Sequence, residues 1–331
     1  LPQCVSFYND RLIQALNSSE FQHITLTRDI TLTQTMNLDA SSQTMIDLNG
    51  QTLSSSADTI ISAEEGAAVL IQNGSLVGSG DTKNGLKSVG ASITLDHVEI
   101  RDVEEGIAVF DNQSSLGLDS SLRLVDSKII GELDGLWIYG NGNTSEKNTT
   151  IVIENSEVFG EKYIGILCNG TYFGTDIQVK NSTVKGFYAA IYFPQKDSLL
   201  TVDKSTLEGG TALAVKGGTV KVIDSTVAGI GDYRSTPLPD DPSKLSMGGY
   251  WDTGDGIYLE ANYPDMKPSI TVEGAATRVT SAYGESVRLY PTADGAKISI
   301  SAGTYSSDVT KYLAPGCTVS KNGDNEFVVG Q

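Results

Sequence analysis

The chain has 331 residues, of which 39% are hydrophobic, and a formal net charge of −18. So large a negative charge argues against nucleic acids and anionic lipid surfaces as partners, and against polyanionic glycans such as pectin unless a divalent cation bridges the two. No apolar run reaches the length of a membrane-spanning helix, so we expect no membrane insertion. No cleavable signal is visible, and we expect that any signal or anchor was removed or lies outside this sequence.

The first segment of the chain predicts a cap. Residues 6–17 place four apolar side chains at helical spacing, namely Phe7, Leu12, Ile13 and Leu16. A short amphipathic helix there would cover the apolar interior of the first turn of a repeat protein. The following residues alternate as strands do, so 1–45 are expected to form the N-terminal cap and irregular first turns.

One repeating unit dominates the centre of the chain, and the stretch from Thr150 to Gly170 shows it best. Ile151 and Ile153 alternate with Val152 and Glu154, which predicts a strand with one buried and one wet face. A break at Asn155 separates this strand from the next. The repeat leaves room for three short strands and no helix. It therefore predicts a β-solenoid, in which successive coils of strands stack on one another, rather than an α/β repeat.

The residue that aligns with Asn155 recurs along the chain. The aligned positions are Asn73, His97, Asp126, Asn155, Asn181, Lys204 and Asp224, and subtraction gives spacings of 24, 29, 29, 26, 23 and 20 residues. Asn and Asp tolerate the left-handed backbone of a tight corner and hydrogen-bond locally, whereas His and Lys interrupt any continuous side-chain ladder. The predicted fold is all-β: a single-stranded right-handed parallel β-helix, or solenoid.

The later part of the chain predicts one interruption and a closing cap. A long loop at 229–255, containing three prolines, separates two strands; such loops are often functional, although a surface elaboration without function is the alternative. Rungs are expected over 46–303 and a C-terminal cap over 304–331. In that cap, Ser306 or Ser307 would begin a helical turn, and Asn322-Gly323 would form the turn of a hairpin. Residues 1–331 thus form one domain.

Three cysteines do not make a disulfide framework. Cys168 falls on the inward register beside Ile166 and is expected in the core. Cys4 and Cys317 would lie at opposite ends of the solenoid, many rungs of about 4.8 Å apart, so we predict no bridge between them.

The opening residues 15–53 and the closing stretch GTYSSDVTKYLAPGCTV (303–319) carry a resemblance to a known family. The chain resembles the right-handed parallel β-helix, pectate-lyase-like proteins that gut bacteria secrete or display on their surface. The resemblance implies an extracellular or cell-surface location and a substrate face along one sheet. It does not imply an activity, because the fold hosts lyases, hydrolases, phage tailspikes and adhesins.

Taking alternate residues of the strands on that implied face as outward gives a row with many aromatic side chains. With Trp251 from the long loop, the candidate carbohydrate-binding residues are Phe110, Trp137, Tyr139, Tyr192, Trp251, Tyr258 and Tyr290. Aromatic rings stack on the apolar faces of sugars, and hydroxyl and indole groups add hydrogen bonds. Two alternatives compete: the row is buried by the Tyr233–Trp251 loop or by another chain, or it only reflects the strand preference of aromatic residues.

Charged residues near the same face suggest chemistry. The candidates are Asp252, Asp255, Glu260, Lys216 and Arg288. Two carboxyl groups at a suitable separation would serve a glycosidase, a basic residue would serve a lyase, and acidic loop residues could hold Ca²⁺. The alternative is a Lys216–Glu260 ion pair of little energetic value.

Catalytic motifs of the related enzymes are mostly missing. DTGDGI at 252–257 only loosely resembles the NTDG signature of the polygalacturonase branch, and that branch's remaining motifs have no clear match. Neither His23 nor His97 lies on the face, so we expect no histidine-based mechanism and no metal site of the zinc type.

The first interpretation is therefore an extracellular bacterial β-helix that binds a polysaccharide or host glycan, or serves as an adhesin, without catalysis. A polysaccharide lyase or glycoside hydrolase acting between the 229–255 loop and the adjacent sheet is the second. A structural stalk is the third.

Overall fold

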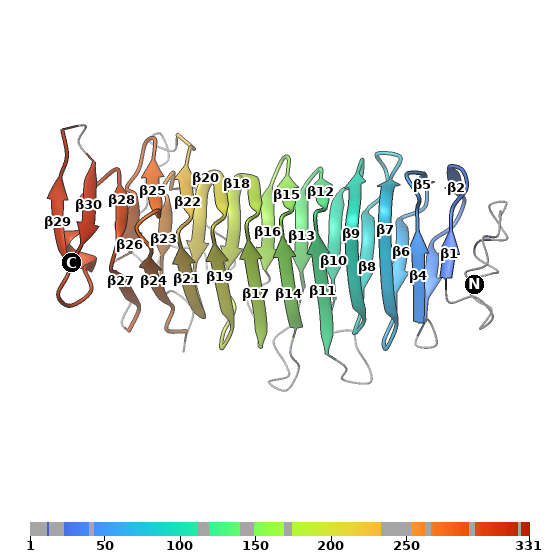
Figure 1. The fold of residues 1–331 in the computed structure, drawn as a ribbon, viewed down its shortest axis with the longest axis horizontal. Coiled ribbons are helices and arrows are strands. Elements are labelled where there is room, and N and C mark those ends of the chain that lie inside the picture. The colour runs from blue at the N-terminus through green and yellow to red at the C-terminus, as the bar shows by residue number, and fades with distance from the viewer. Residues whose placement is uncertain are drawn as a thin grey trace.

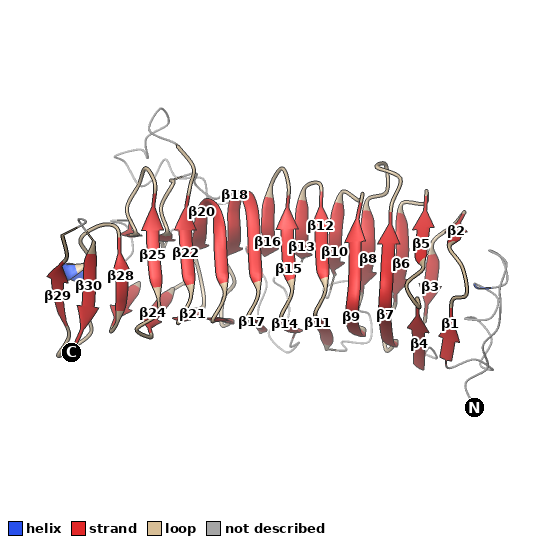
Figure 2. Ribbon diagram, turned by 45° about the horizontal axis from the view of Figure 1, so that its top comes forward, coloured by secondary structure: helices blue, strands red, loops and turns tan. Residues whose placement is uncertain are grey.

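The computed structural model describes residue 12 and residues 23–39, 43–110, 119–139, 149–168, 174–232, 253–261, 266–290, 295–323 and 326–331. These residues form an elongated tube with His23–Thr25 at one end and Phe327–Gly330 at the other (Figure 1). Strands dominate the described chain, and a single short helical segment near the C-terminal end stands out in Figure 2. The prediction of an all-β parallel solenoid is confirmed.

Three ladders of parallel strands run along the tube, and each turn of the chain contributes one strand to each ladder in the order A, B, C. Ladder A consists of β1 (His23–Thr25), β4 (Gln43–Asp47), the first halves of β7 (Ala68–Val77) and β9 (Ser92–Arg101), β11 (Ser120–Val125), β14 (Thr149–Glu154), β17 (Thr175–Lys180), β19 (Leu199–Asp203), β21 (Thr219–Ile223), β24 (Ser269–Glu273) and β27 (Lys297–Ile300).

Ladder B follows after a corner. It consists of β2 (Ile30–Leu32), β5 (Thr52–Ser55), the second halves of β7 and β9, β12 (Lys128–Gly131), β15 (Glu157–Gly160), the first parts of β18 (Thr183–Phe193) and β20 (Thr206–Val215), β22 (Thr226–Gly229), β25 (Arg278–Ser281) and β28 (Gly303–Tyr305).

Ladder C completes each turn. It consists of β3 (Met36–Leu38), β6 (Thr59–Ala63), β8 (Asn84–Ser88), β10 (Glu105–Val109), β13 (Asp134–Ile138), β16 (Ile164–Cys168), the last parts of β18 and β20, β23 (Ile257–Leu259) and β26 (Val287–Leu289). All three ladders begin within residues 23–38, in the segment expected to form irregular first turns.

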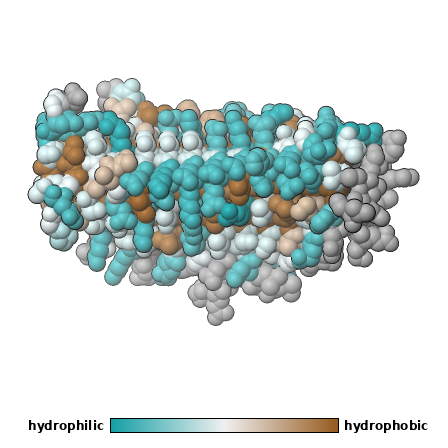
Figure 3. Space-filling view, in the orientation of Figure 1, coloured by the Kyte–Doolittle hydropathy of each residue, from teal (hydrophilic) through white to brown (hydrophobic). Residues whose placement is uncertain are grey.

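The interior of the tube is a continuous column of aliphatic side chains. Ile151 and Ile153 are fully buried, while Val152 between them is only partly covered. The parallel register places Ile177 above Ile151 and Val179 above Ile153, so like side chains stack from rung to rung. Buried apolar area of this kind is the main source of stability. The outer face shown in Figure 3 is, by contrast, mostly hydrophilic.

The corner between ladders A and B lies where the sequence predicts it. The backbone angle φ is positive at all seven aligned residues: 58° at Asn73, 56° at His97, 46° at Asp126, 51° at Asn155, 48° at Asn181, 49° at Lys204 and 44° at Asp224. Asn49 extends the column toward the N-terminus and Gly274 continues it, with φ of 51° and 89°. At each of the seven aligned positions, one left-handed residue therefore turns the chain from ladder A into ladder B.

A column of serines beside this corner carries hydrogen bonds from rung to rung. The hydroxyl of Ser156 accepts from the backbone N–H of Ser127 at 3.0 Å, and the N–H of Ser156 donates to the hydroxyl of Ser182 at 3.0 Å. The pattern continues to Ser205 and Ser225 at 3.1 and 3.0 Å. Each hydroxyl also donates to the carbonyl two residues before it, as Ser182 does to Lys180. The corner N–H groups, which strand pairing leaves over, are satisfied in this way.

Of the predicted N-terminal helix, only Leu12 belongs to the described residues; it is helical and fully buried. At the C-terminal end, β29 (Thr318–Lys321) and β30 (Phe327–Gly330) form a hairpin, and β30 pairs antiparallel with β28.

The predicted helical turn is the 3-10 segment η3 (Thr310–Tyr312), but its cap differs from the prediction. Ser306 and Ser307 do not cap it, because their hydroxyls accept from the N–H groups of Ser281 and Ser286 on the preceding turn. The carboxylate of Asp308 accepts instead from the N–H of Thr310 at 2.8 Å.

Cys168 is buried in the core and Cys317 is half-buried, and both are free thiols; Cys4 lies outside the described residues. Within the described ranges, no helix is long and apolar enough to span a membrane.

Candidate functional site

The outer face of ladder C carries the predicted row. The register aligns one residue per rung in a column of Ala108, Trp137, Leu167, Tyr192, Ala214, Tyr258 and Arg288. Two residues further along the strands lie Phe110, Tyr139, Lys216, Glu260 and Tyr290. Trp137, Tyr192 and Tyr258 thus lie on one side of the tube. Trp251 and Asp252 fall outside the described residues.

Three half-buried rings form a cluster toward the N-terminal half of this face. Phe110, Trp137 and Tyr139 each contact the other two, with ring centroids 5.3 Å apart for Phe110–Trp137, 5.2 Å for Trp137–Tyr139 and 5.5 Å for Phe110–Tyr139. We call these residues the aromatic platform. The ammonium of Lys87 lies 5.1 Å from the centroid of the Phe110 ring, within cation–π range. Mutual edge contacts fix the orientation of the three rings.

The C-terminal half of the row is buried, which differs from an exposed aromatic row. The exposed fractions of Tyr192, Tyr258 and Tyr290 are 4%, 0% and 6%. Tyr192 packs with Ile164, Ala189 and Ala214 in an apolar cluster on the outer side of the sheet, separate from the interior core. Outward alternation predicted the direction of these side chains, but it carries no information about what covers them.

Lys216 and Glu260 form an ion pair in this buried region. The ammonium lies 2.6 Å from Oε1 of Glu260, and both side chains have no exposed surface. The hydroxyl of Tyr258 donates to Oε2 of the same carboxylate at 2.7 Å, and the ring of Tyr192 lies 5.5 Å from the ammonium. Burial lowers the pKa of Lys216, although the Glu260 carboxylate opposes this shift. The predicted Lys216–Glu260 ion pair is therefore present, and both of its charges are removed from water.

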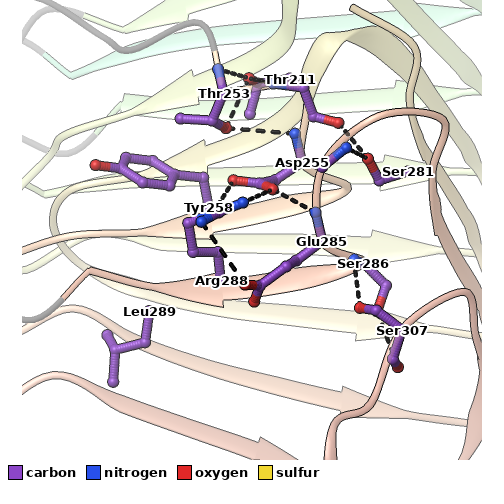
Figure 4. A network of polar contacts seen from close by, with 12 residues as sticks. Thr211, Thr253, Asp255, Tyr258, Ser281, Glu285, Ser286, Arg288, Leu289 and Ser307 are labelled. Carbon is purple, nitrogen blue, oxygen red and sulfur yellow. Dashed lines mark hydrogen bonds and ion pairs between the residues drawn. The ribbon is translucent and has the colours of Figure 1, made fainter. Parts of the chain in front are cut away.

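Asp255 and Arg288 form a second pair one rung further on (Figure 4). Asp255 is fully buried and accepts two hydrogen bonds from the guanidinium, from Nε at 2.7 Å and from an Nη at 3.1 Å. It also accepts from the backbone N–H of Glu285 at 2.7 Å. Four of the five predicted catalytic candidates therefore lie in two neighbouring ion pairs, where each charged group already has its partner.

The first residues of β10 and β13 form a carboxyl pair that the sequence reasoning missed. Glu105 and Asp134 are register partners on adjacent strands, and their exposed fractions are 8% and 3%. Glycines follow both residues, and a Cβ at Gly106 would lie 2.4 Å from the carbonyl oxygen of Gly135. The same Cβ would lie 2.5 Å from a methyl group of Ile129 in the interior, so the glycine side of these strands is crowded.

Glu105 and Asp134 lie opposite one another on adjacent strands, so the ionisation of each carboxyl group affects the other. Burial, assisted by the neighbouring charges of Asp134 and Glu104, raises the pKa of Glu105 to about 9. Burial also raises the pKa of Asp134 to about 7, and this carboxylate accepts from the N–H of Ile164 at 3.0 Å.

No family model matches this chain, and no curated protein matches it. Among solved structures it is similar to the Dettilon tailspike protein gp208, with 13% sequence identity and a TM-score of 0.51. The similarity covers 94% of this chain and 68% of the tailspike chain. At this identity the comparison shows the fold: nearly the whole chain has the same solenoid architecture as the tailspike.

Proposed function

We propose that this chain is an extracellular bacterial surface protein that binds a polysaccharide or host glycan on the outer face of ladder C. The aromatic platform carries the proposal. Three rings at fixed mutual angles remain partly open to solvent on an otherwise mostly covered face. Rigid aromatic surfaces bind sugar rings because their orientation is set before the ligand arrives.

The name of the structural neighbour, a tailspike protein, supports a surface role such as that of an adhesin. The rung spacing of a parallel solenoid, about 4.8 Å, also repeats contacts along the tube axis, which suits an extended chain ligand. The net charge of −18 favours a neutral glycan over a polyanionic one.

Binding is favoured over catalysis by the state of the charged candidates. Lys216, Glu260 and Asp255 have no exposed side-chain surface, so a lyase or glycosidase reaction there would require the Lys216–Glu260 and Asp255–Arg288 ion pairs to open. A structural stalk remains the third candidate, and a binding assay separates it from the first.

The test is retention of the protein on an immobilised glycan array. We expect Trp137→Ala to weaken binding to the retained glycan at least about tenfold, since buried aromatic anchors contribute most of the affinity of such surfaces. Tyr283→Ala is the matched control, because Tyr283 is 48% exposed and comes from the connection between β25 and β26. If the wild-type protein binds nothing on the array, the structural stalk becomes the favoured interpretation. Release of reducing ends or unsaturated products from a glycan would establish an enzyme.

A further inference from the structure

The edge at which ladder B passes into ladder C carries a polar cavity. The connections between these two ladders line the upper edge of the tube in Figure 1. The cavity has a volume of about 680 Å³, and the charged side chains in its walls are Arg101, Asp102, Glu132, Glu161 and Lys162. Small-molecule sites usually have about 300–1,000 Å³, so this cavity is large enough for a small polar ligand.

The charged groups of the cavity alternate in sign. Arg101 forms an ion pair with Asp102, and Lys162 forms one with Glu132. Each pair places N–H donors beside carboxylate acceptors, which matches the hydroxyl groups of a sugar because a hydroxyl both donates and accepts. Two cations against three carboxylates leave the cavity only slightly negative, which suits a ligand without charge.

Three aromatic rings follow the cavity on the same edge. Tyr163 comes directly after Lys162, and its carbonyl accepts from the N–H of Tyr188 on the next rung at 2.9 Å. Ring centroids are 5.7 Å apart for Tyr163–Tyr188 and 4.8 Å apart for Tyr188–Phe187, and both pairs are nearly perpendicular. Tyr163 also packs against the buried cluster that contains Ile164. The outermost ring, Phe187, is therefore held by its neighbours while 60% of the residue is exposed.

The apolar surface of this edge is too small to be explained by a second copy of the chain. Among the described residues, the exposed large hydrophobic side chains are Phe187, Ile230 and Tyr283, and all three lie where ladder B passes into ladder C. A fully covered aromatic side chain buries about 150–250 Å², so three side chains that are half exposed offer far less than the ~800 Å² per partner of a stable protein interface. The net charge of −18 further opposes the association of two copies.

We propose that this edge is a second carbohydrate-binding site for a neutral glycan. Phe187 stacks on one sugar ring, and Lys162 and Glu132 hydrogen-bond the hydroxyl groups of a neighbouring unit. Because the Phe187 ring is already held by other rings, little ordering is needed on binding. The choice of a glycan as ligand rests on the proposed function, but the site is separate from the aromatic platform, whose Trp137 lies within a ladder C strand rather than at the edge.

The test is calorimetric titration with short oligosaccharides prepared from the glycan that the wild-type protein retains on the array. We expect two sites per chain in the wild type, and one site in either Phe187→Ala or Trp137→Ala. Loss of stacking should weaken the edge site at least about tenfold, since covering a Phe side chain contributes that much or more. Lys162→Met should weaken the same site, and Phe187→Tyr should keep it because the ring remains. The site that Phe187→Ala retains shows that this variant is folded.

Ile230→Ala is the matched control, because Ile230 is 52% exposed on the same edge, two rungs beyond Phe187, and should leave both sites unchanged. A single wild-type site that Trp137→Ala removes and Phe187→Ala keeps would overturn the edge site and leave the proposed function standing. The reverse pattern would establish the edge site and overturn the platform, and a wild-type protein that retains no glycan would overturn both. In sedimentation equilibrium, a dimer that both Phe187→Ala and Ile230→Ala dissociate would assign the edge to self-association instead.

Discussion

The Lys216–Glu260 pair offers the sharpest test of the buried face. Removing one member of a buried ion pair leaves an uncompensated charge, which costs about 3–5 kcal/mol, whereas replacing both members by neutral groups is often neutral. We therefore expect Lys216→Met and Glu260→Gln each to destabilise the protein by about that amount. The double variant should lie close to the wild type, because the amide oxygen introduced by Glu260→Gln keeps an acceptor for the Tyr258 hydroxyl.

Thermal unfolding measures this effect. With an unfolding entropy of about 2.1 cal/mol/K per residue, a chain of 331 residues loses about 4–7 °C in Tm for a loss of about 3–5 kcal/mol. Hydrogen exchange of the β20 and β23 amides would locate the change on the two strands that carry the pair.

The exposed pair of Lys162 and Glu132 is the matched control, with exposed fractions of 65% and 43% for the two side chains. Lys162→Met should leave the Tm close to that of the wild type, because an exposed ion pair contributes little. If Lys216→Met costs as little as this control, or if the two single effects simply add in the double variant, the pair is not held in a dry environment and the reasoning fails.

Three further predictions concern the other columns. In EDTA, the Tm should fall as the pH rises from about 5 to about 9. The pKa values of about 7 for Asp134 and about 9 for Glu105 mean that the folded protein retains protons that the unfolded chain has released. Glu105→Gln should flatten this dependence of the Tm on pH in calorimetry. Asn155→Val should cost at least about 1–2 kcal/mol in urea unfolding because φ is 51°, whereas Asn155→Gly should be nearly neutral, and equal costs would contradict the corner argument. Ser182→Ala should cost about 1–3 kcal/mol by the same assay because it leaves the N–H of Ser156 without its acceptor, and an unchanged urea midpoint would show that the serine column contributes nothing.

The architecture and the A–B corner could be predicted because they depend on local rules. Alternation of apolar residues sets the strands, and one residue type tolerates the left-handed corner. The serine column was visible as a Ser after Asn155, Asn181 and Asp224, but its role depends on a partner on the next rung. No local rule specifies that contact.

The candidate site was predictable in register but not in burial. Counting alternate residues placed Trp137 and Tyr258 in one column, yet Trp137 is partly open and Tyr258 fully covered. Glu105 and Asp134 were missed as a pair because an acidic residue followed by glycine is also the usual sequence of a turn. The usable signal was the repetition of an acidic residue and glycine at the start of successive ladder C strands, which occurs again at Asp255.

The connection from ladder C back to ladder A absorbs much of the difference in turn length. The 29-residue turns that end at Asp126 and Asn155 have ten residues between these ladders, from 110 to 119 and from 139 to 148, whereas the 20-residue turn that ends at Asp224 has three, from 216 to 218. The A–B corners at Asp126, Asn155 and Asp224 meanwhile all have two residues between the flanking strands. Length can thus be added at one edge without disturbing pairing elsewhere, so this edge is suited to grafting foreign peptide segments at regular intervals along a rigid rod.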